Sequence, residues 1–127
     1  MSSQNIGSGA ERRRHLRLEH NVPVKISGGD VDIVTETKDL SCSGTFCRIN
    51  KFIPPMTRLK LNLLLPVRKN GKIVDKRIKC EGVVVRTESD SDGEYFHAAI
   101  FFSDISSKDS QVISEFVESV IKEKSDA

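Results

Sequence analysis

The residues of this chain best suited to chemistry are ones that would bind a ligand. They are two arginines four residues apart and, further along the chain, an aspartate, a serine and a glycine. Arg13 and Arg17 carry planar, permanently charged guanidinium groups, which hold phosphate oxygens or the acceptor edge of a guanine through paired hydrogen bonds. Asp39 and Ser41 offer a carboxylate that accepts from N–H donors and a hydroxyl that donates or accepts. Gly44 lacks a Cβ, so its backbone can take a positive φ or approach a ligand closely. Together these residues predict a site for an anionic ligand with guanine-like edges.

The order of these motifs, R-x-x-x-R at 13–17 and then D-x-S-x-x-G at 39–44, resembles the PilZ domain, the bacterial receptor module for cyclic di-GMP. A looser match lies downstream, in 82–86 and in Tyr95-Phe96-His97 with Phe101-Phe102. The resemblance covers roughly residues 11–122. It implies a mainly β fold, a six-stranded antiparallel β-barrel with a C-terminal amphipathic helix. It also implies a cytoplasmic second-messenger receptor and not an enzyme.

The resemblance also implies the roles of the motif residues. Arg13 and Arg17 contact phosphate and guanine, Asp39 and Ser41 bind a guanine, and Gly44 shapes the loop. No cofactor or metal is expected beyond the ligand itself. The partners are then cyclic di-GMP and a downstream protein that the sequence does not identify. An arm of several residues that orders around the ligand would be the signal, because that ordering reshapes the surface that a partner binds.

Two further arginines receive separate interpretations. In this family an arginine directly before the first motif arginine often accompanies two stacked ligand molecules. Arg12 occupies that position, which favours a stacked dimer of cyclic di-GMP and adds Arg12 to the ligand-binding residues. Arg86 is interpreted as making a structural hydrogen bond or ion pair beside the site, and is only a weak candidate for contacting a base.

Length and charge set the limits for this interpretation. A chain of 127 residues with a net charge of +2 suits one domain and is not a bulk binder of polyanions. The basic residues gather at 12–17 instead. We expect a disordered tail over 1–10, a domain over 11–122 and a short tail over 123–127. No apolar run approaches the ~20 residues that span a bilayer, so no membrane partner is expected.

Cysteine usage agrees with a reducing compartment. Cys42, Cys47 and Cys80 form an odd set without C-x-x-C spacing, which argues against a disulfide framework or a zinc site. Cys47 and Cys80 are expected to be small apolar fillers on strands.

Alternation and turn residues predict the elements. Residues 22–26 and 31–35 flank a Gly-Gly-Asp turn, and leucines alternate over 59–65. A loop is expected over 39–44. Asn70-Gly71 predicts a hairpin turn that joins the strand containing the leucines to a strand over 72–87. A last strand is expected over 94–103. Apolar residues then recur at helical spacing over 112–121, after a capping-box start at Ser106. That helix is expected to pack across the barrel.

Three other classes of protein fit this sequence less well than a receptor. An enzyme would need a catalytic partner for His15, His20 or His97, and their spacing supplies none. A small barrel that binds single-stranded nucleic acid would need exposed aromatic platforms. This chain has one tyrosine, no tryptophan and six phenylalanines, most of which are expected in the core, so nucleic acid is not the favoured partner. A PilZ-type adaptor without a ligand would lack the two motifs.

Overall fold

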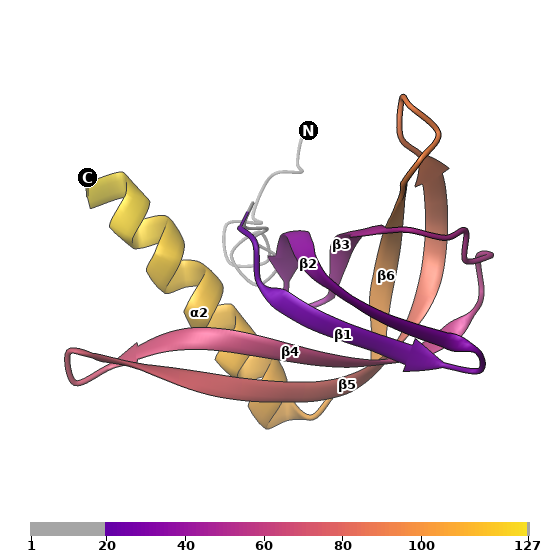
Figure 1. Cartoon of the computed structure of the whole chain (residues 1–127). Coiled ribbons are helices and arrows are strands. Elements are labelled where there is room, and N and C mark those ends of the chain that lie inside the picture. Colours follow the sequence, from indigo (N-terminus) through magenta and orange to yellow (C-terminus); the bar gives the residue numbers. More distant parts are fainter. Residues whose placement is uncertain (1–19, 127) are drawn as a thin grey trace, which may run out of the picture.

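The computed structural model describes residues 20–126, which form six antiparallel strands and one helix (Figure 1). The strands close into a barrel in the order β1-β2-β3-β6-β5-β4, which confirms the predicted fold class. Their bounds are β1 Pro23–Gly28, β2 Val31–Ser41, β3 Gly44–Ile49, β4 Arg58–Lys69, β5 Lys72–Ser89 and β6 Phe96–Asp104, and the helix is α2, Ser107–Asp126.

Alternating side chains fill the barrel because successive residues of a strand point to opposite faces. Leu59, Leu61, Leu63 and Leu65 of β4 are at most 2% exposed, as the alternation predicted. Cys47 and Cys80 are also buried, and loss of hydration on burial raises the pKa of each thiol to about 12.

Two turns show where local sequence was and was not sufficient. Asn70 and Gly71 have φ values of 53° and 77°, the left-handed pair that a type I′ hairpin turn requires, so this prediction is confirmed. The loop expected over 39–44 is wrong. β2 continues to Ser41 and β3 begins at Gly44, so Asp39 and Ser41 are strand residues and the turn itself is Cys42-Ser43.

The β4–β5 hairpin is longer than the barrel. β1 pairs with β4 only from Lys60 to Leu63, and β6 pairs with β5 from Glu81 onward. Residues 64–79, which we call the finger, are therefore a two-stranded ribbon that projects past the barrel wall (Figure 1).

Helix α2 packs on the barrel, as its apolar spacing predicted. The backbone N–H of Asp109 donates to the Ser106 hydroxyl at 3.0 Å, an N-cap that satisfies one of the unpaired amides of the first turn. Ile113, Phe116 and Val117 are buried within the barrel's core, and the helix contacts β2 and β4.

Candidate functional site

A hollow of about 390 Å³ lies on the outer wall of the barrel, within the range of small-ligand pockets. It crosses four neighbouring strands, because β2, β3, β6 and β5 lie side by side in the ring. Its lining is Asp39, Ser43, Gly44, Thr45, Phe46, Val85, Arg86, Ala99, Ile100 and Phe101.

Two β-bulges border this hollow. Between Thr37 and Asp39 the pairing of β2 with β3 shifts, so Lys38 is an extra residue, and between Val84 and Arg86 Val85 is extra in the pairing of β5 with β6. Bulges bend a strand and redirect the adjacent side chains. They bring Asp39 and Arg86 to opposite sides of the same hollow, an acidic and a basic group across a surface of mixed polarity.

Gly44 is required by the backbone that passes beside it. A Cβ at this position would collide with the carbonyl oxygen of Ile100 and lie 3.4 Å from the Cα of Phe101. Gly44 is not among the described residues with a positive φ. The close approach that the sequence suggested is therefore made to β6 of the same chain. Glycine at this position therefore lets β3 and β6 lie close together, and it adds no side chain to the lining of the hollow.

Ser41 is placed differently from Asp39. It is fully buried, does not line the hollow, and its hydroxyl lies 3.0 Å from the Ser43 hydroxyl and accepts from the Ser43 N–H at 3.2 Å. These contacts hold the β2–β3 turn in shape. In this structure Ser43, which sequence reasoning missed, is the serine that faces the hollow; contact between Ser41 and a guanine stays a prediction.

Arg86 lies at the rim with most of its side chain in solvent. Its Nε is 3.0 Å from an Oε of Glu88, which agrees with the ion pair interpreted from the sequence. Both side chains are more than half exposed, so the pair adds little to stability and a ligand anion could compete for the guanidinium. Beside it, Val85 and Phe101 are 55% and 51% exposed and give the hollow an apolar edge.

Ala99 supplies space between the larger side chains of the hollow. It is the outward-facing member of the Ala98-Ala99 pair, since Ala98 is fully buried and Ala99 lines the hollow.

The segment that leads into β1, residues 20–22, is fastened next to the acidic motif. The Thr37 hydroxyl donates to the His20 carbonyl at 2.8 Å and accepts from the Val22 N–H at 3.0 Å. The Thr37 N–H donates to the Val22 carbonyl at 2.9 Å. Thr37 lies two residues before Asp39, so the chain carrying the arginine motif joins the barrel close to the hollow. No local pattern around Thr37 indicates this role.

Arg12, Arg13 and Arg17 lie outside the described residues. The covalent chain still limits their reach: at ~3.6 Å per residue, Arg17 stays within about 11 Å of His20 and Arg13 within about 25 Å.

Exposed aromatic rings are more numerous than the sequence suggested. The expectation that most phenylalanines are core residues is wrong, since only Phe102 and Phe116 are buried. Phe101 lines the hollow and Phe52 is 52% exposed. Within residues 20–126 no group of His, Cys, Asp and Glu could hold a metal ion. In the same range no helix is long and apolar enough to span a bilayer.

Comparison with known proteins decides the family. The sequence matches the family model of the PilZ domain over residues 11–119. The chain belongs to the PilZ family. A search of curated proteins finds no match. Among solved structures, the Bacillus subtilis inhibitor of motility MotI/DgrA is similar, with a TM-score of 0.73 and 20% sequence identity over 89% of this chain. This PilZ chain covers 52% of that protein, and at this identity the likeness supports the fold alone.

Proposed function

We propose that this PilZ domain is a receptor that binds cyclic di-GMP over the hollow between Asp39 and Arg86. One observation carries the proposal. The hollow is bordered by Asp39 of the second motif, and the segment continuing from the first motif is fastened two residues away, at Thr37.

Each part of the ligand has a chemical counterpart here. Asp39 offers a carboxylate to the N–H donors of a guanine, and the exposed ring of Phe101 offers an apolar surface for its face. Arg13 and Arg17 would hold the phosphates and a guanine edge through charge-assisted hydrogen bonds. Gly44 supports the site indirectly, because the missing Cβ lets β6, which carries Phe101, pair closely with β3.

The signal would be a change in the arm that carries the arginines. Ordering each arm residue costs ~1–2 kcal/mol of backbone entropy, which hydrogen bonds of ~1.5–3 kcal/mol to charged groups can offset. The segment after the arm also touches the helix, because the rings of His20 and Phe116 lie 5.9 Å apart edge to face. An ordered arm would therefore present a new surface beside α2 for a partner protein to bind.

Calorimetric titration with cyclic di-GMP tests the proposal. Arg13→Ala and Arg17→Ala should each cost ~2–4 kcal/mol, which is about 30- to 1,000-fold in affinity. Arg58→Ala is the matched control, since Arg58 is an exposed arginine outside the hollow's lining. Full affinity in both motif variants, or an equal loss in the control, would contradict the assignment.

The acidic motif residue is tested by selectivity. Asp39→Asn keeps the shape of the side chain but replaces one acceptor oxygen with a donor. It should therefore weaken the binding of cyclic di-GMP and reduce the protein's preference for cyclic di-GMP over cyclic di-AMP. Asp32→Asn is the control, on the same strand and exposed but absent from the hollow. An unchanged preference in Asp39→Asn would remove Asp39 from guanine recognition.

Stoichiometry tests the role proposed for Arg12. A ratio near two ligands per protein that falls towards one in Arg12→Ala would support a stacked dimer, and a ratio near one in the unaltered protein would remove it. Chromatography of the ligand after incubation should recover it unchanged, since binding and not catalysis is proposed.

Among residues 20–126, the exposed aromatic rings other than Phe101 are Phe52 and Tyr95, and neither offers an open stacking platform for nucleic acid. Phe52 packs edge to face on Phe96 at 5.9 Å, and the Arg48 guanidinium covers the Tyr95 ring at 3.9 Å from its centre. In a competition titration at moderate salt, single-stranded oligonucleotides should therefore fail to displace cyclic di-GMP.

A further inference from the structure

The finger, residues 64–79, carries more positive charge than the chain as a whole. It contains six basic side chains and one acidic one, a net +5 against +2 for the chain. The basic residues are Arg68, Lys69, Lys72, Lys76, Arg77 and Lys79, and the acidic residue is Asp75. None of these positions belongs to the ligand motifs or lines the hollow, so the finger is a separate feature of the surface.

Apolar side chains lie directly behind the turn of the finger. Ile73 is 64% exposed and Val74 is 40% exposed. They point to opposite faces of the ribbon because they are consecutive strand residues. Ile73 pairs with Arg68 across the ribbon, and Val74 pairs with Val67. Both faces therefore carry an accessible apolar group close to the tip.

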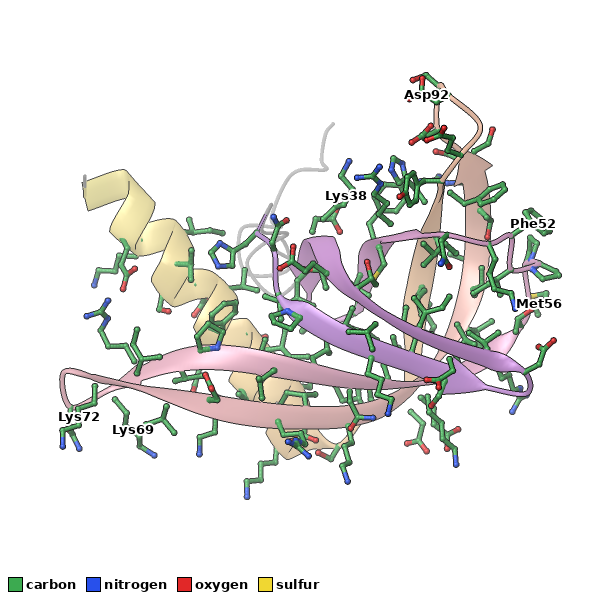
Figure 2. The ribbon with its side chains drawn as sticks, in the orientation of Figure 1. Lys38, Phe52, Met56, Lys69, Lys72 and Asp92 are labelled. Atoms are coloured by element: carbon green, nitrogen blue, oxygen red, sulfur yellow. The ribbon has the colours of Figure 1, made fainter. Side chains whose placement is uncertain are left out.

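Basic residues are distributed over both faces in the same way. Lys69 and Lys72 are paired at the turn on the face of Val74, while Arg77 lies on the face of Ile73. Figure 2 shows Lys69 and Lys72 at the end of the ribbon, far from the barrel wall, where their amines reach into solvent. We call residues 67–74 the tip of the finger. The Nε of Arg68 in the tip is 3.5 Å from the Glu123 carboxylate of α2, and this ion pair links the tip to the helix.

We propose that the tip of the finger binds the surface of an anionic lipid bilayer. Its lysines and arginines would contact headgroup phosphates, and Ile73 and Val74 would enter the interfacial layer. The finger carries basic and apolar groups on both faces of its ribbon, and this arrangement favours a bilayer surface over an acidic protein as the partner. A protein surface covers one face of a ribbon, whereas a layer of headgroups surrounds a tip that enters it end-on.

No membrane partner was expected from the sequence, because the chain has no long apolar run. A contact at the bilayer surface requires no membrane-spanning segment, so that observation does not argue against it. The inference is also independent of cyclic di-GMP, since the finger lies outside the hollow. A peripheral contact would hold the receptor at the bilayer surface and leave Asp39 and the β2–β3 turn accessible.

Vesicle co-sedimentation with the full chain tests the inference. The protein should bind vesicles of phosphatidylcholine mixed with phosphatidylglycerol, and should bind phosphatidylcholine vesicles much more weakly. Binding should also fall as salt is raised, because the charges at the contact are screened. Equal binding to both vesicle types, or no binding to either, would overturn the proposal.

Charge variants locate the contact. Lys69→Glu with Lys72→Glu should reduce partitioning by about 25-fold or more, since each cation near an anionic surface contributes about fivefold. The control, Lys51→Glu with Lys108→Glu, makes the same change of net charge at two exposed lysines outside the finger. A loss in the control as large as in the finger variant would overturn the proposal, because binding would then depend only on net charge.

The apolar contribution has its own variant. Ile73→Ser should weaken partitioning by about tenfold through lost transfer of one aliphatic side chain, with no change of charge. Thermal melting should show each variant folded, as expected for substitutions at exposed positions. Polyglutamate serves as the probe for an acidic protein partner. Retention by polyglutamate without vesicle binding would overturn the proposal in favour of a protein surface.

Discussion

Thr37→Val is the substitution that most directly tests how the leading segment is held beside the candidate site. Thr37 is fully buried. Its hydroxyl donates to the His20 carbonyl and accepts from the Val22 N–H, at 2.8 and 3.0 Å. Valine has nearly the same volume but can make neither bond, so the change removes the hydrogen bonds and leaves the packing in place.

The expected cost follows from what those two groups lose. Val22 is fully buried, and a buried N–H without a partner costs ~1–3 kcal/mol. His20 is half-buried, so water can reach its carbonyl and the loss there is nearer ~1 kcal/mol. The total of about 2–4 kcal/mol should lower the Tm by roughly 10 °C for a domain of this size.

Thermal melting followed by circular dichroism measures this, with Thr35→Val as the control. The Thr35 hydroxyl also donates to a carbonyl, that of Arg48 at 2.7 Å, but at an exposed position. Its loss should cost less than ~1 kcal/mol. If cyclic di-GMP binds as proposed, titrations below the melting range should then show weaker binding in Thr37→Val, because Thr37 no longer holds residues 20–22 through its hydroxyl. Equal Tm values for the two variants would refute the reasoning.

Three further predictions concern the barrel itself. Gly44→Ala should destabilise the fold by ~1–3 kcal/mol, because its Cβ would displace the Ile100 carbonyl. Urea unfolding measures this loss of stability. An unchanged unfolding midpoint would contradict the close approach of β3 to β6. Burial raises the pKa of Cys47 from 9.0 to about 12, so Cys47 should resist iodoacetamide at pH 8 while half-buried Cys42 reacts first. Because the unfolded thiol ionises at lower pH than the folded one, Cys47 should also make stability fall between pH 9 and pH 12, by up to ~1.4 kcal/mol per pH unit. Cys47→Ala should remove that part of the slope, and a slope unchanged by the substitution would contradict it.

Local patterns predicted most of the fold because they depend on neighbouring residues. The alternating leucines of β4, the Asn70-Gly71 turn and the Ser106 cap each follow from short-range sterics or hydrogen bonding. The D-x-S-x-x-G segment was predicted less well. Asp and Ser are common in turns, yet here pairing with β3 extends β2 through both residues.

The parts of the site that were missed depend on long-range pairing. Lys38 and Val85 resemble ordinary strand residues, and only their register against β3 and β6 makes them bulges. Thr37 gains its role from a segment fifteen positions earlier in the chain. The exposure of Phe101 likewise follows from which wall it faces, and residue type alone does not specify that.

The closed ring of strands also determines where another chain could add a strand to this protein. Within residues 20–126, each barrel strand has a neighbour on both sides, so its main-chain groups offer no template to another chain. Unpaired edges occur where β4 and β5 run on alone. Pro66 removes one amide from that edge, and the lysines there repel a second copy. The same charges therefore help to keep a projecting ribbon from nucleating aggregates.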